Sequence, residues 1–246
     1  MIKFFRKIRQ NLLNEGKTAK YFKYAIGEIV LVVIGILIAL QVNTWKEDLG
    51  DKRIERSMMK NLNSEFTNNL DKLKESRTQY VQTEISIRLL MSSMQSSSEE
   101  LKQKNIDSLF AKAIDVYDYR PTQNALTEIL ASGNLKLLTN DSLKSMLFQW
   151  SAELNEKEEA WQTLDDFNQN MVIPYLTKNA SMRNIDSYSI LKWKKKSKFN
   201  VNHENIFNDI EFENNLDNLA WGVINYETVL ERLEKIIEQL IILTDD

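Results

Sequence analysis

The sequence IVLVVIGILIAL, which occupies residues 29–40, contains no charged or strongly polar side chain. Extended outward to residues 24–44, it is long enough, as a helix, to cross a hydrocarbon core of about 30 Å. Tyr24 and Trp45 stand at its two ends, where amphipathic rings prefer the headgroup level of a membrane. A helix buried in a soluble core is the alternative, but such helices seldom carry an apolar surface all round. The stretch therefore predicts one transmembrane helix over residues 24–44, surrounded by the lipid bilayer.

Basic residues are concentrated before this stretch. Residues 1–23 contain seven Lys and Arg residues and one Glu, a net charge of +6, whereas the basic residues after Trp45 are interleaved with acids. Because Lys and Arg favour the cytoplasmic side, we expect residues 1–23 to form a basic cytoplasmic segment and residues 45–246 to lie in the periplasm of a Gram-negative cell. No small-residue cleavage site follows the apolar run. We therefore expect an uncleaved signal anchor in the inner membrane rather than a signal peptide.

One face of the predicted membrane helix carries Glu28, Gly35 and Ala39, because their spacing returns to the same side at about 100° per residue. Gly35 and Ala39 form a small-x-x-x-small pair, which allows a second helix to approach closely. An unpaired carboxylate is costly in lipid, so Glu28 in such a contact would be paired or protonated. The ordinary alternative is that Glu28, near the helix end, reaches the membrane surface. We hypothesise that this face packs against a second copy of the chain or an envelope protein.

The composition beyond the membrane helix predicts an all-α fold. The whole chain has only six glycines and two prolines, and a β-rich domain of this length would need many more turn residues. Apolar residues recur mostly at steps of three, four or seven, as on helices that pack along one side. We expect an extramembrane antiparallel helical bundle with long helices. They are expected near residues 54–94, 106–117, 121–131, 142–171 and 216–240.

The clearest of these helices is the last, which carries an unbroken apolar stripe. Its members are Leu216, Leu219, Val223, Tyr226, Leu230, Leu233, Ile237 and Leu240. Such a stripe favours packing in a helical bundle or in a coiled coil with another chain, and the intramolecular bundle is the simpler interpretation. At the other end of the domain, little except Gly50 would break a helix, so the membrane helix can continue into the first helix of the bundle.

Four residues mark expected helix ends. Pro121 suits a first helical turn, and Gly133 suits a C-terminal cap. Asn140 is a good N-terminal cap for the helix that follows it, and Pro174 is expected to end that helix.

Residues 178–204 are polar and irregular, and we expect them to form the longest loop. They include the run WKKKSK at residues 193–198. A solvated loop is the ordinary interpretation, and docking to anionic lipid or to an acidic partner is the alternative. His203, in the same stretch, is expected to be an ordinary exposed residue.

The sequence lacks the residues of a recognisable catalytic centre. It has no cysteine, which excludes Cys-ligated metals, and the single His203 excludes metal sites that need two histidines from one chain. No phosphate-binding loop, dinucleotide fingerprint or nucleophile elbow is present. The chain as a whole carries −3, so residues 24–246 carry −9, which disfavours nucleic acid. We expect no enzyme activity, and hence no catalytic residue, cofactor or metal site.

Two parts of the sequence carry a resemblance to a known family. The first comprises the N-terminal sequences MIKFFRKIRQNLL and KYFKYAIGEIVLVVIGILIALQVNTW, which include Gly27-Glu28. The second is Pro121-x-x-x-Ala125-Leu126, followed by Ser132-Gly133-Asn134-Leu135 and Asn140. In these parts the chain resembles an uncharacterised family of bacterial single-span inner-membrane proteins, named only as a domain of unknown function. The resemblance implies an inner-membrane protein and supplies no activity.

These observations favour a membrane-anchored helical interaction or scaffold module of the bacterial envelope. The alternative is a sensor-like ligand-binding bundle, which would need a partner to transmit its signal because residues 1–23 are too few for a signalling domain. A polar, converging pocket between helices would favour ligand binding, whereas a filled core with an exposed apolar patch would favour a protein partner.

Overall fold

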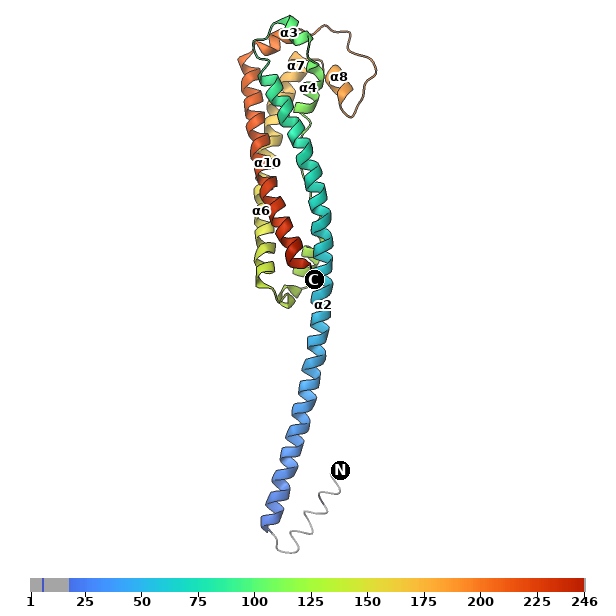
Figure 1. Ribbon diagram of the computed structural model, residues 1–246, viewed down its shortest axis with the longest axis vertical. Coiled ribbons are helices and arrows are strands. Elements are labelled where there is room, and N and C mark those ends of the chain that lie inside the picture. The colour runs from blue at the N-terminus through green and yellow to red at the C-terminus, as the bar shows by residue number, and fades with distance from the viewer. Residues whose placement is uncertain (1–5, 7–17, 246) are drawn as a thin grey trace. The chain divides into compact units, whose positions relative to one another are not determined.

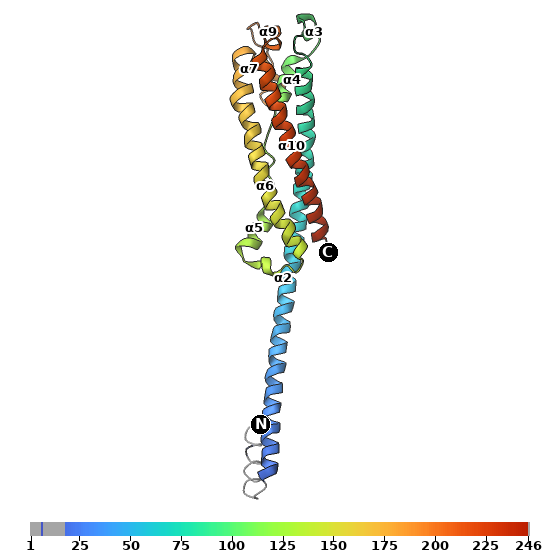
Figure 2. The same cartoon turned by 90° about the vertical axis from the view of Figure 1, so that its left-hand side faces the viewer.

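The computed structural model describes residue 6 and residues 18–245, and Figures 1 and 2 show it from two sides. Within these residues the chain is all-α, as predicted, and contains no strand. Of the predicted basic segment, residues 1–5 and 7–17 lie outside the described residues. The helices are α2 (Thr18–Met91), α3 (Ser98–Lys102), α4 (Ile106–Ala113), α5 (Asn124–Ala131), α6 (Asp141–Phe167), α7 (Ile173–Asn179), α8 (Met182–Ile185), α9 (His203–Phe207) and α10 (Ile210–Thr244).

The chain divides into two compact units, Met1–Ser57 and Met58–Asp246, and α2 contributes residues to both. In the first unit, α2 contains an 18-residue stretch with a mean hydropathy of 2.6, and none of it is buried. This helix is long and apolar enough to cross a membrane. Its predicted continuation past Gly50 is confirmed, because α2 is unbroken there. The predicted domain boundary at residue 45 stays a prediction.

In the second unit, α10 runs antiparallel to α2. Asn63 Nδ2 on α2 donates a hydrogen bond to the carbonyl oxygen of Ile241, near the end of α10, at 3.1 Å. Further along α2, Arg77 pairs with Glu234 of α10. Rising residue numbers on α2 therefore meet falling numbers on α10, and both Figure 1 and Figure 2 show the two helices side by side.

Helix α6 is also antiparallel to α10. Glu153 Oε1 accepts a hydrogen bond from Arg232 Nε at 2.6 Å, and Leu164, further along α6, lies against Gly222, earlier in α10. Helices α2 and α6 consequently run in the same direction, and the chain must return from one end of the bundle to the other between them. Figure 2 shows α3 and α4 at one end of the bundle and α5 at the other.

Residues 114–123, here called the return segment, make this connection without a helix. Near its start, the carbonyl oxygen of Asp115 accepts a hydrogen bond from Thr83 on α2 at 3.4 Å. Just after its end, the N–H of Ala125 donates to Glu65 on α2 at 2.9 Å. The distance from Thr83 to Glu65 along the helix is about 27 Å, so the segment advances about 2.7 Å per residue, as an extended chain does.

The extended path of the return segment corrects two predictions. The helix expected over residues 106–117 ends at Ala113, and the helix expected to begin at Pro121 begins at Asn124. The reason is distance, because a helix advances only about 1.5 Å per residue. If the return segment were helical, it would cover only about half of the distance between Thr83 and Glu65.

A further correction concerns Pro174, which does not end a helix. A turn of π-helix, Asn168–Val172, follows α6, and α7 then continues through the proline to Asn179. In an α-helix proline lacks the required N–H and clashes with the carbonyl group four residues before it. The wider π-helical turn relieves this conflict and lets the chain continue.

The two other helix ends that were predicted from single residues are confirmed. Asn140 is the N-cap of α6, and its side chain accepts the N–H of Leu143 at 3.1 Å. Gly133, after α5, has φ 69°, a left-handed conformation that favours glycine.

The core of the bundle is filled by the apolar faces of α2, α6 and α10. All eight residues of the predicted stripe on α10 are buried, which confirms that the stripe packs within the chain. Trp150 of α6 is 1% exposed and meets the ring of Phe66 of α2 edge-on, with centroids 5.5 Å apart. Gly222 allows α10 to approach α6 closely, because a Cβ there would lie 3.2 Å from Leu164 Cα.

The close approach at Gly222 generates a prediction. Gly222→Val should lower the free energy of unfolding by about 2 kcal/mol, since overpacking of a filled core typically costs 1–3 kcal/mol. Asn214→Val, at an exposed position of the same helix, is the control and should change stability by less than about 0.5 kcal/mol. Denaturant unfolding of both variants measures the difference, and equal stabilities would contradict the close approach.

Candidate functional site

The predicted helix-packing face lies on α2, in the first unit. Gly35 and Ala39 are exposed and Glu28 is half-buried. A Cβ placed on Gly35 would meet nothing within 4 Å, so no described residue packs closely against Gly35. The role of Glu28, Gly35 and Ala39 in association stays a prediction.

In the second unit, the most heavily buried polar groups surround the return segment. Tyr80 of α2 donates its hydroxyl hydrogen to the carbonyl oxygen of Tyr117 at 2.7 Å. Tyr226 of α10 accepts the N–H of Tyr119 at 2.8 Å. Burial raises the pKa of both the Tyr80 and the Tyr226 hydroxyl, so both remain protonated and able to donate.

The second half of the return segment is held by Asn69, which is fully buried on α2. Its side-chain amide donates to the carbonyl oxygen of Thr122 at 2.8 Å and accepts the N–H of Thr122 at 2.8 Å. The side chain thus pairs with the backbone as a neighbouring strand would. Buried backbone groups that lack a helix or sheet partner need such side-chain partners.

A buried ion pair joins the return segment to α6. Lys157 Nζ lies 2.6 Å from Asp118 Oδ1, and their side chains are only 5% and 6% exposed. The hydroxyl of Tyr226 donates to the same oxygen at 3.0 Å. Arg120, which is exposed, reaches the other carboxylate oxygen at 3.1 Å. These groups satisfy one another and present no open face to a substrate, so we assign them a structural role.

The sequence contained one overlooked signal for this ion pair. Lys157 lies three residues after Leu154 and four before Trp161, so it occupies a core position within an apolar pattern. A charged residue at such a position indicates a buried partner. Asp118 has no comparable signal, because the return segment has no periodic pattern.

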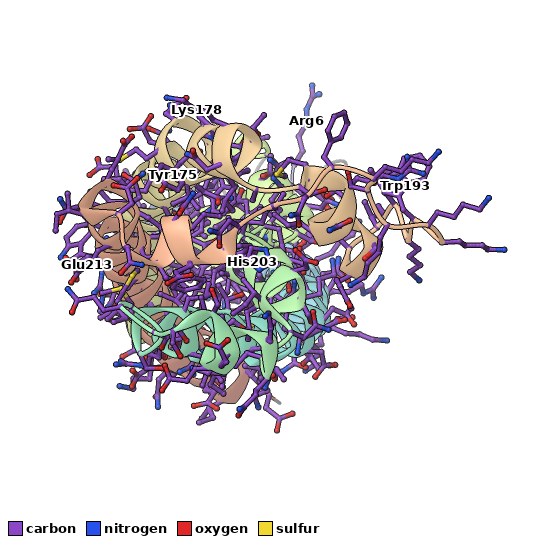
Figure 3. All side chains as sticks on the ribbon, turned by 90° about the horizontal axis from the view of Figure 1, so that it is seen from above. Arg6, Tyr175, Lys178, Trp193, His203 and Glu213 are labelled. Atoms are coloured by element: carbon purple, nitrogen blue, oxygen red, sulfur yellow. The ribbon has the colours of Figure 1, made fainter. Side chains whose placement is uncertain are left out.

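The most exposed apolar side chains of the second unit lie in residues 188–199, here called the basic loop. It contains five lysines and no acidic residue. Ile190 and Phe199 are 91% and 86% exposed, higher than any other large apolar residue among those described. In Figure 3, which views the bundle from its end, Trp193 lies on a loop that projects beyond the helices. The predicted loop of residues 178–204 is therefore partly confirmed, although α8, the last two residues of α7 and the first two residues of α9 lie within it.

The basic loop is anchored by the residues of α8. Arg183 Nε donates to the carbonyl oxygen of Lys195 at 3.0 Å, and its guanidinium lies over the Trp193 ring at 5.7 Å. The side chain of Asn184 accepts the N–H of Ser197 at 2.8 Å. These contacts fix the base of the loop on the bundle while leaving Ile190 exposed.

A polar cavity of about 490 Å³ lies beside the basic loop, at the end of the bundle formed by α3, α4 and α9. Lys104, Asp107, Lys196 and His203 are among the residues that line it. Its volume falls within the range of small-molecule sites. Within the described residues, no three or more His, Asp or Glu side chains gather as they would around a metal ion.

The cavity corrects the expectation for His203, which is not an ordinary exposed side chain. It is half-buried, its ring meets Phe110 edge-on, and its Nε2 lies 3.5 Å from Asp107 Oδ1. The Asp107 side chain is 8% exposed, and its Oδ1 accepts no hydrogen bond from a described residue. Figure 3 shows His203 near the centre of this end of the bundle. Sequence spacing could not reveal the contact, since the two residues are almost one hundred positions apart.

The buried ion pair generates a second stability prediction. Lys157→Met should lower the free energy of unfolding by about 3 kcal/mol, because it leaves the Asp118 carboxylate buried with fewer partners. Lys144→Met is the control on the same helix, where a surface ion pair with Asp141 should contribute about 0.5 kcal/mol. Denaturant unfolding measures both variants. Similar effects from the two substitutions would contradict the structural role of the pair.

Comparison of the sequence with known protein families gives a match. A family of unknown function, DUF6090, matches residues 28–157, just over half of the chain. The match includes Glu28, the return segment and Lys157, and ends before the basic loop. No curated protein and no solved structure matches the chain. The chain belongs to the DUF6090 family, whose function is unknown.

Proposed function

We propose that this protein is a membrane-anchored interaction module of the bacterial envelope. In this proposal α2 crosses the inner membrane once, with residues 1–23 in the cytoplasm and the bundle in the periplasm. The exposed apolar surface of α2 and the +6 charge of residues 1–23 support this placement. In this proposal the bundle acts by binding rather than by catalysis, since the tyrosine, asparagine and ion-pair groups around the return segment are engaged with its backbone or with one another.

The observation that carries the interaction role is the basic loop. A single exposed apolar residue is normal on a soluble protein, but the basic loop exposes several, among them Ile190 and Phe199. Here both are almost fully exposed, next to five lysines, while the base of the loop is fixed by α8. An exposed apolar cluster with a polar rim is typical of a binding surface.

Crosslinking in native membranes tests the interaction role. A photoreactive residue at position 190 should give specific adducts, and the same probe at exposed position 214 should give none. Recovery of the uncrosslinked monomer alone from both positions would overturn the proposal. A periplasmic reporter at the C-terminus should be active, and activity of a cytoplasmic reporter there would reverse the proposed orientation.

A separate prediction concerns the face formed by Glu28, Gly35 and Ala39. If this face packs against another helix, Gly35→Leu should reduce association in a membrane two-hybrid assay, because leucine prevents close backbone approach. Val33→Leu, on a different face of the helix, is the matched control and should leave the signal unchanged. An unchanged signal for Gly35→Leu would remove this face from the proposal.

The polar cavity favours a second candidate function, a sensor-like ligand-binding bundle. Because Asp107 Oδ1 accepts no hydrogen bond from a described residue, a ligand with an ammonium group could displace His203 and supply a donor.

His203 offers a direct test of that candidate, because it is the only histidine in the chain. Titration with arginine or spermidine should shift its ring signals in the NMR spectrum, and Asp107→Asn should abolish the shift. Unmoved ring signals with either compound would contradict a site for ammonium-bearing ligands.

A further inference from the structure

Charge is distributed very unevenly along the chain. Residues 178–201, which contain α8 and the basic loop, carry seven basic residues and one acid, a net charge of +6. Residues 1–23 also carry +6, and the whole chain carries −3, so the remaining residues carry −15. A strongly basic surface therefore projects from an otherwise acidic bundle.

The lysines of the basic loop are not used within the bundle. None of Lys192, Lys194, Lys195, Lys196 and Lys198 forms an ion pair with another described residue. Asp186, the one acidic residue within residues 178–201, accepts the backbone N–H of Lys192 through its own carbonyl oxygen, at 3.0 Å. The five ammonium groups are consequently available to an external anionic surface.

The apolar residues of the loop alternate with these charges. Ile190, Leu191, Trp193 and Phe199 are 91%, 53%, 48% and 86% exposed. Side chains of this kind, set among lysines, are typical of segments that enter the headgroup region of an anionic membrane. An aromatic ring and an aliphatic side chain enter the lipid, while ammonium groups stay beside the phosphates.

We propose that the basic loop binds the surface of an anionic phospholipid bilayer, with Ile190 and Phe199 inserted below the headgroups. This inference rests on the proposed function, and it names the partner of the surface described there. The bundle would thereby make a membrane contact that is separate from the apolar stretch of α2.

Lipid fits the loop better than a folded protein does. The loop that carries Trp193 projects beyond the helices, and Ile190 and Phe199 in the same loop are almost fully exposed. A bilayer supplies many equivalent phosphates and needs no fixed geometry, whereas a specific protein interface needs shape complementarity. The acidic bundle of a second copy is the competing occupant, and the experiment below separates the two.

The experiment uses the full chain held by its apolar helix in nanodiscs of phosphatidylcholine. Binding to separate vesicles is measured by flotation, with vesicles of phosphatidylcholine alone or mixed with phosphatidylglycerol. We expect binding only to vesicles that contain phosphatidylglycerol, and we expect it to weaken as salt concentration rises.

Two pairs of variants test the loop itself. Lys194→Gln/Lys195→Gln/Lys198→Gln should weaken binding on the order of 100-fold, since each lysine near an anionic surface contributes about a factor of five. Lys46→Gln/Lys60→Gln/Lys74→Gln, with the same charge change on α2, is its control. Ile190→Ser/Phe199→Ser should also abolish flotation, whereas Ile210→Ser/Ile242→Ser, at two exposed isoleucines of α10, should not.

The outcomes are distinct. Equal flotation of the loop variants and their controls would overturn the proposal, as would equal binding to both kinds of vesicle. Loop-dependent association of nanodiscs with one another in the absence of vesicles would assign the loop to a second copy instead. Circular dichroism confirms that each variant is folded. Failure of the proposed anchor would appear separately, as chain that does not remain with the nanodiscs.

Discussion

The return segment imposes the main constraint on this bundle. Because α2 and α6 run in the same direction, about ten residues must carry the chain back through the core in an extended form. An extended segment cannot satisfy its own backbone polar groups, and no neighbouring strand is present among the described residues. Tyr80, Tyr226 and Asn69 take the place of that strand. The Asp118–Lys157 ion pair then joins the same segment to α6.

This arrangement explains why the core of the bundle offers little chemistry. Tyr80, Tyr226, Asn69 and the Asp118–Lys157 pair already have partners, and the neighbouring positions are filled by aromatic and aliphatic side chains. Features that are available to other molecules lie at the surface. In the second unit these are the basic loop and the adjacent cavity, and in the first unit the exposed apolar stretch of α2.

The candidate sites differed in how far they could be predicted. The basic run at residues 193–198 could be recognised from the sequence, because it contains four lysines and no acidic residue. The exposure of the run and its contacts with Arg183 could be recognised only from the three-dimensional structure. The contact between Asp107 and His203 was not predictable, since it joins two short helices across a long separation in sequence. Gly35 and Ala39 are exposed on α2, and their role together with Glu28 in helix packing stays a prediction.

The amino-acid sequence predicted the helical class, the apolar stretch and the buried face of α10, because each follows from local composition or periodicity. It also determined the caps at Gly133 and Asn140, which depend on one residue and its neighbours. The direction of α6 and the extended form of residues 114–123 depend instead on how the helices of the bundle pack together. The physical reason is that a helix and an extended chain cover different distances, and the distance to be covered is set by helices elsewhere in the bundle.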